Sequence, residues 1–163
     1  QLKIWNGKAR GARPLLDSDG KPLNPKHLHK KDLVFAILRW SALPGASRHH
    51  WGTDFDVIDR AAMTKDYKVQ LVPSEFEEGG IFAGLHEWLD KHLDKYQFCR
   101  PYEVDYGGIA PERWHLSFKP VAAQCASLLT LDMLSEVIEA TDIELKDTIL
   151  KELPSIYSRF IKI

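Results

Sequence analysis

The chain has 163 residues, of which 44% are hydrophobic, and a formal net charge of −1. This length and composition are sufficient for one domain with its own core, and they exclude a disordered chain. Acidic and basic residues are interspersed without a basic stripe, so we expect no nucleic-acid partner. No apolar run approaches the roughly 20 residues that a membrane-spanning helix needs, so we expect no membrane span.

The N-terminal segment 1–32 is polar and irregular apart from one turn. Residues 15–21 read Leu-Leu-Asp-Ser-Asp-Gly-Lys, and the aspartates and the glycine predict a hairpin turn there. The same Asp-x-Asp-Gly string begins calcium loops, but no glutamate stands at the twelfth position that such a loop requires. Residues 33–41 are almost continuously apolar, which predicts either a strand or a short buried helix that ends before Pro44-Gly45.

A further strand is predicted over residues 53–58. Alternation along it places Asp54 and Asp56 on one face and Phe55 and Val57 on the other. Asp56 would therefore stand on rigid backbone, where a metal ligand belongs.

The middle of the chain alternates between loops and short elements. His115 is predicted to lie on the face of its strand opposite Trp114 and Leu116. The predicted elements are a loop at 59–80, a helix at 81–97, a short strand at 98–102, a loop at 103–111 and a strand at 114–118.

The remaining residues, 121–163, predict a helical C-terminal extension of a single domain that covers residues 1–163. Their apolar side chains recur at helical spacing. Pro154 is expected to mark a break between two helices, because a proline ring clashes with the preceding helical turn. Cys99 and Cys125 form no CxxC pair; two buried thiols are the simpler expectation, and one disulfide is the alternative.

Two short motifs, more than fifty residues apart, carry the chemistry. The first runs from Ser47 to Asp56 and contains His49, and the second runs from Glu112 to His115. Two imidazoles and one carboxylate leave a fourth zinc position open for the reacting water, which a hydrolytic site requires. Glu112 is then free to carry the proton. The pattern predicts His49, Asp56 and His115 as zinc ligands and Glu112 as the catalytic acid and base.

Two other interpretations of these residues stay open at this point. The first is that they are unrelated polar residues on loops, because a histidine and an aspartate seven positions apart are common. The second is a non-haem iron site, which also uses two histidines and one carboxylate. Such a site usually has its His-x-Asp pair on one strand, and it would leave Glu112 without a role.

The signature of the bacterial zinc D-Ala-D-Ala carboxypeptidase family (VanY-like, LAS-type metallopeptidases) resembles two strings of this chain, Ser47-x-His49-x-x-Gly52-x-x-x-Asp56 and Glu112-x-Trp114-His115. Pro44-Gly45 also matches the family pattern, and the resemblance covers roughly residues 33–120. It implies an α+β fold, in which helices flank a small antiparallel sheet and zinc lies in a surface cleft. It also implies that His49, Asp56 and His115 bind zinc and that Glu112 is the general base.

The chain departs from the family pattern in two places. The family usually has a small residue where this chain has Asp54, and it usually has an arginine in an upstream Ser-Gly-Tyr-Arg-like strand that we do not find here. A carboxylate at position 54 near the metal would repel an anionic substrate terminus or bind a cationic group. Arg39 is our candidate for the missing catalytic clamp on the substrate carbonyl. An ordinary surface ion pair is an equal alternative for Arg39, and Arg48 is the alternative clamp.

The predicted function is zinc-dependent hydrolysis of peptidoglycan stem peptides, with D-Ala-D-Ala carboxypeptidase as the first choice. An endopeptidase that cuts within the stem or the cross-bridge is the alternative among enzymes, and a non-catalytic wall-binding module is the alternative outside them. We expect a monomer in the periplasm or outside the cell. The predicted substrate-binding residues are Ser47, Arg48, Asp54 and Trp114, with core packing as the other interpretation for Trp114.

Overall fold

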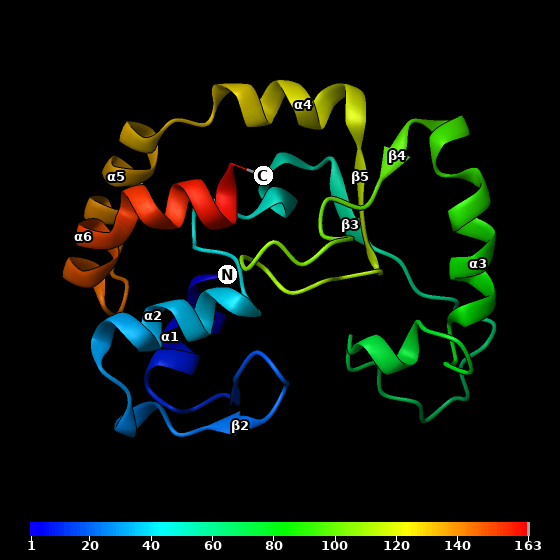
Figure 1. The fold of residues 1–163 in the computed structure, drawn as a ribbon, viewed down its shortest axis with the longest axis horizontal. Coiled ribbons are helices and arrows are strands. Elements are labelled where there is room, and N and C mark those ends of the chain that lie inside the picture. The colour runs from blue at the N-terminus through cyan, green and yellow to red at the C-terminus, as the bar shows by residue number, and fades with distance from the viewer. Residues whose placement is uncertain (163) are drawn as a thin grey trace.

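The computed structural model describes residues 1–162 and is a mixed α+β protein (Figure 1). Four helices, α1, α2, α5 and α6, gather on one side, while the larger sheet and α3 lie on the other side and α4 runs between the two. The helices are α1 (Leu2–Ala9), α2 (Lys30–Arg39), α3 (Ala83–His92), α4 (Lys119–Leu128), α5 (Leu131–Ala140) and α6 (Lys146–Ile156). The strands are β1 (Leu15–Leu16), β2 (Pro22–Leu23), β3 (Asp54–Asp56), β4 (Phe98–Cys99) and β5 (His115–Phe118).

The larger sheet has three antiparallel strands in the order β3-β5-β4. Its central strand β5 pairs with β3 so that Asp56 faces His115 and Asp54 faces Ser117. Phe55 and Leu116 point to the other face, as the alternation predicts, and line an apolar groove beside α3. The predicted α+β class with a small antiparallel sheet flanked by helices is therefore confirmed.

The hairpin turn predicted at residues 15–21 is also confirmed. Strands β1 and β2 pair across it, and Asp17 Oδ1 accepts hydrogen bonds from the backbone N–H groups of Asp19 at 2.9 Å and Lys21 at 2.8 Å. Gly20 adopts a positive φ of 78°, which an L side chain tolerates poorly. The aspartate carboxylate thus closes the turn, which explains the Asp-x-Asp-Gly string without calcium.

The apolar segment 33–41, for which sequence left strand and helix open, forms most of helix α2. Its fully buried residues are Leu33, Val34, Ile37 and Leu38, a spacing that places them on one helical stripe. This stripe packs in the larger of two hydrophobic clusters, together with residues of α1, α5 and α6. The smaller cluster contains Phe76, Phe82 and Trp114 and lies on the sheet side of the molecule.

The expected helix break at Pro154 is wrong. Helix α6 continues through Pro154 to Ile156 and passes into a π-helical turn at Tyr157–Ile161. A proline inside a helix removes one backbone hydrogen bond. Here the residues on either side of it, Leu153 and Ile156, are buried in the larger cluster, and their burial offsets that loss.

The structure also bears on the state of the two cysteines and on the expected absence of a membrane-spanning helix. Cys99 and Cys125 are both free thiols and both half-buried. Among residues 1–162, no single helix is long and apolar enough to cross a membrane; α4 and α5 pass that test of length and composition only as a pair, which is bent by 76°.

We predict that the buried residues of helix α6 stabilise the folded protein as other core residues do. Ile149 of α6 is completely buried there, so Ile149→Ala should lower the free energy of unfolding by about 2–5 kcal/mol. Leu128, at the end of α4, is 70% exposed, and Leu128→Ala should change that free energy by less than about 0.5 kcal/mol. Urea unfolding of both variants measures the difference, and equal losses would contradict this assignment of the core.

Candidate metal centre

Three side chains that could ligate a metal converge from separate elements. His49 belongs to a short 3₁₀ turn, Arg48–Trp51, which ends at Gly52 with a φ of 70°. Asp56 is the last residue of β3, and His115 is the first residue of β5. The antiparallel register places Asp56 directly opposite His115. Residues far apart in the chain therefore meet because a turn and two paired strands share one edge.

The donor atoms of these three residues have the spacing of a metal site. One donor atom from each lies within 4.8 Å of the others. Asp56 Oδ1 is 3.7 Å from His49 Nε2 and 3.5 Å from His115 Nδ1. Two ligands about 2.0–2.1 Å from a tetrahedral zinc ion lie about 3.4 Å apart, so the three residues fit zinc with little movement.

A buried nitrogen without a partner supports the same fit. His115 is almost completely buried, and its Nδ1 has no hydrogen-bond partner among the described residues. A buried polar atom without a partner is costly unless something else satisfies it. Nδ1 faces Asp56 and Glu112, both of which offer carboxylate oxygens, and a cation bound between these groups would supply the missing contact.

One residue, Asp54, orients both imidazoles. His49 Nδ1 donates to the backbone carbonyl oxygen of Asp54 at 3.1 Å, and His115 Nε2 donates to Asp54 Oδ1 at 3.0 Å. Each ring therefore carries its hydrogen on the nitrogen that faces Asp54. The opposite nitrogens, Nε2 of His49 and Nδ1 of His115, keep their lone pairs for a metal, as the partners behind metal-bound histidines require.

The Asp54 carboxylate is itself enclosed by donors. It accepts hydrogen bonds from Arg48 Nε at 2.7 Å, Thr53 Oγ1 at 2.6 Å and Ser117 Oγ at 3.0 Å, besides the one from His115. Burial would raise the pKa of Asp54, but these donors, with His115 first, hold it well below its usual range. Because its side chain has no exposed area and does not line the cleft, the structure directs Asp54 toward the two imidazoles and away from the predicted substrate-binding position.

Glu112 stands beside the three donor residues without joining them. Its Oε2 lies 3.7 Å from His115 Nδ1, and its backbone N–H donates to the Tyr102 carbonyl at 2.8 Å, which fixes the loop before β5. Burial, with the charge of Asp56 in support, raises the pKa of Glu112 to about 7. A carboxyl group with a pKa near neutrality is suited to both accept and return a proton.

The carboxylates around His115 favour positive charge at this place. Burial alone would lower the pKa of His115, but its contacts with Asp54 and Asp56, together with the charge of Glu112, raise it. Protons and metal ions compete for the same lone pair. The site therefore offers a negatively charged pocket to either of them.

A cleft of about 810 Å³ contains the donor residues and Glu112. Ser47 and Trp114, two predicted substrate-binding residues, also line it. Ser47 is buried and accepts a hydrogen bond from Gln1 Nε2 at 3.3 Å. Trp114 is 4% exposed, and its ring packs 4.8 Å from that of Phe76, so its main contact is with the smaller hydrophobic cluster.

The two arginines considered as clamps both line the cleft and both have acidic partners. Arg39 forms a two-fold ion pair with Asp105 and donates to the Gly108 carbonyl at 2.9 Å. Arg48 is held by Asp54 and also donates to Ser117 Oγ at 2.8 Å. Arg48 is thus bound to Asp54 and Ser117 beneath the three donor residues. Arg39 lies in the wall of the cleft, where Asp105 neutralises its charge.

Sequence reasoning missed two residues near the site. The ring of Tyr102 lies edge-on to that of His115, with centroids 4.8 Å apart, and lines the cleft. Lys8 of α1 donates to Ser41 Oγ at 2.8 Å; burial lowers its pKa, against the nearby charge of Glu112. Neither belongs to a recognisable motif, and the contact of Lys8 with this region depends on how α1 packs, so no local pattern could have identified them.

The arrangement of these residues defines a class of site. Two histidines, one aspartate and a separate glutamate in a cleft form a donor set that metal-dependent hydrolases use. The family model VanY, D-alanyl-D-alanine carboxypeptidase, matches residues 1–121, and the chain belongs to this family, as its motifs predict. An uncharacterised protein of Haemophilus influenzae (strain ATCC 51907 / DSM 11121 / KW20 / Rd) is 31% identical over 121 residues, which cover 73% of this chain and 92% of that protein. No solved structure matches the chain.

We predict that Asp54 determines the affinity of the site for metal. Asp54→Asn removes the charge that holds Arg48 and replaces one of the two acceptor oxygens by an N–H donor, so the four donors around this side chain can no longer all be satisfied. Zinc affinity should therefore fall by about 10–100-fold. Asp66, an exposed aspartate, provides the matched control, because Asp66→Asn makes the same chemical change on the surface. Competition with a chelating dye measures both affinities, and an Asp54→Asn variant that binds zinc as tightly as the control would contradict the orienting role.

Proposed function

We propose that this chain is a zinc-dependent peptidase that acts on peptidoglycan stem peptides, with removal of a terminal D-Ala as its main reaction. The observation that carries the proposal is the convergence of His49, Asp56 and His115, with donor atoms within 4.8 Å, and of Glu112 at 3.7 Å from His115. Membership of the D-alanyl-D-alanine carboxypeptidase family supports the substrate class. His49 Nε2, Asp56 and His115 Nδ1 would hold the zinc ion.

The residues of the chain divide the catalytic work between them. When bound, zinc supplies a Lewis acid that polarises the peptide carbonyl and makes water reactive near neutral pH. Glu112 accepts the proton of the attacking water and then delivers it to the departing amine. Asp54 fixes both imidazoles, so that the geometry does not have to reorganise during the reaction. Both arginines line the cleft, but Arg48 is held by the buried carboxylate of Asp54. Arg39 is therefore the proposed contact for the substrate carbonyl.

The bond that is cut and the place of action are also part of the proposal. An endopeptidase reaction is the alternative, and it is favoured by the length of the cleft, whose lining includes both the hairpin turn at 18–20 and the loop at 70–73. Because the substrate is a component of the cell wall, we propose that the protein acts in the periplasm or outside the cell.

We predict that Glu112→Gln abolishes the reaction without removing the metal. The amide cannot accept the proton, so kcat should fall by about 10²–10⁴-fold, while zinc content stays unchanged because Glu112 is not among the three donor residues. The substrate is a stem pentapeptide that ends in D-Ala-D-Ala, and products are identified by mass spectrometry with and without a chelator.

Glu78→Gln is the control, because Glu78 is exposed and does not line the cleft. Loss of one terminal D-Ala would establish a carboxypeptidase, and an internal fragment would establish an endopeptidase. If zinc-loaded Glu112→Gln cleaves as fast as the Glu78→Gln control, the proposed mechanism is wrong.

A further inference from the structure

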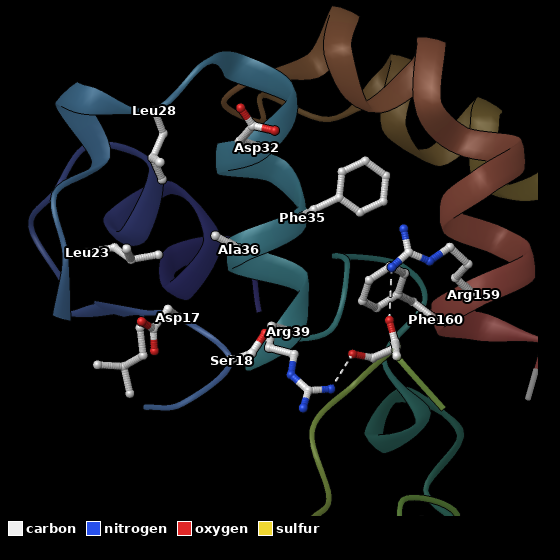
Figure 2. Close-up of a pocket in the computed structure, with 13 residues that line it drawn as sticks. Asp17, Ser18, Leu23, Leu28, Asp32, Phe35, Ala36, Arg39, Arg159 and Phe160 are labelled. Carbon is white, nitrogen blue, oxygen red and sulfur yellow. Dashed lines mark hydrogen bonds between the residues drawn. The ribbon is translucent and has the colours of Figure 1, made fainter. Parts of the chain in front are cut away.

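A second cavity opens between α2, the β1–β2 hairpin and the C-terminal turn Tyr157–Ile161 (Figure 2). It has a volume of about 310 Å³. Leu23, Leu28, Phe35 and Ala36 give it an apolar wall, while Asp32 and Arg159 place opposite charges around it. Such a combination suits an aliphatic chain that ends in charged groups.

This cavity adjoins the cleft that contains the donor residues. Leu16, Ser18 and Arg39 line both of them. The loop before β5 also joins the two, because Gly108 lines the cavity and Glu112, four residues later, lines the cleft. Four residues span at most about 14 Å. A peptide held at Glu112 can therefore place a long side chain from a neighbouring residue in the cavity.

Arg159 is prepared to bind an anion. Its guanidinium carbon lies 5.2 Å from the ring centroids of both Phe35 and Phe160, and its Nη2 donates to the Gly107 carbonyl at 3.0 Å. Within residues 1–162 no carboxylate lies within ion-pair distance of Arg159. The rings fix the plane of the guanidinium and leave its other donors for a ligand.

Asp32 offers the complementary charge on the same wall. It lies in the first turn of α2, is exposed, and accepts no hydrogen bond from the described residues. Phe35 follows it by three positions, so the two side chains are neighbours on the helix. Figure 2 shows the Phe35 ring between Asp32 and Arg159. A ligand that lies along this ring can reach both charges.

We infer that this cavity is a subsite for a stem-peptide residue whose long aliphatic side chain ends in both a carboxylate and an ammonium group, as that of meso-diaminopimelate does. The carboxylate binds Arg159, the ammonium binds Asp32, and the methylene groups pack on Phe35 and Ala36. This inference rests on the proposed function for the class of substrate. Arg159 and Phe160 lie outside residues 1–121, the part of the chain that the family model matches, so the family match does not account for these two residues of the subsite.

The test compares two stem peptides that differ in one carboxylate. One carries meso-diaminopimelate as its third residue and the other carries L-lysine, which keeps the ammonium but lacks the carboxylate. Calorimetry on the zinc-loaded Glu112→Gln protein measures both dissociation constants without turnover. We expect the diaminopimelate peptide to bind about tenfold more tightly, as one added charge-assisted contact allows.

Variants assign this preference to single residues. Arg159→Gln should weaken the diaminopimelate peptide to the level of the lysine peptide and leave the lysine peptide unchanged. Asp32→Asn should weaken both peptides, since both carry the ammonium. Lys31→Met is the matched control, because Lys31 also lies near the Phe35 ring, at 5.9 Å, but pairs with Glu152 at 2.9 Å and does not line the cavity. It should change neither affinity.

Failure of the subsite and failure of the proposed function have different signatures. Equal affinities for the two peptides, no binding of either, or a preference that survives Arg159→Gln would overturn the subsite, even if the wild-type protein cleaves both peptides. A preference that Arg159→Gln removes would establish the subsite, even if the wild-type protein cleaves neither.

Discussion

The candidate site depends on the hydrogen bonds that Asp54 makes in two directions. Its backbone carbonyl fixes His49 and its carboxylate fixes His115, so one residue decides which nitrogen of each imidazole keeps its lone pair. Strand pairing makes this possible, because the register that sets Asp56 opposite His115 also sets Asp54 opposite Ser117. A shift of one residue would turn both aspartates to the apolar face of the sheet.

The hydrogen bonds of Asp54 also explain why its ion pair with Arg48 is buried beneath the site. Removing Arg48 and Asp54 from water costs several kcal/mol per ion, and their attraction alone does not ensure a gain in stability. The carboxylate of Asp54 has four donors around it, so no oxygen of this group is left unsatisfied. The geometry therefore assigns this pair to the orientation of the imidazoles.

Sequence patterns predicted part of the site and of the fold. They could not predict features that depend on contacts between residues far apart in the chain. Alternation along 53–58 placed Asp54 and Asp56 on one face, and motif spacing selected the three residues that the structure brings together. Periodicity could not show that Asp54 is enclosed, because its partner Ser117 is 63 positions away. It also could not choose between strand and helix for 33–41, where the choice depends on packing against α1 and α6. Pro154 was misjudged for the same reason, since its helix is held by buried neighbours.

The larger hydrophobic cluster extends across the end of the family match at residue 121. The larger cluster joins residues of α1 and α2 to residues of α5 and α6, and Trp5 Nε1 donates to the Glu144 carbonyl at 3.0 Å. Residues inside and outside the matched range therefore share one core.

The cleft lies between the two sides of the molecule. The donor residues stand on the sheet side, while Ser41, Arg39 and the hairpin turn line the cleft from the helical side. Because α6 and its following turn pack on α2, the C-terminal segment both supports that wall and places Arg159 beside it. The C-terminal segment therefore contributes both to the shared core and to one wall of the adjoining cavity.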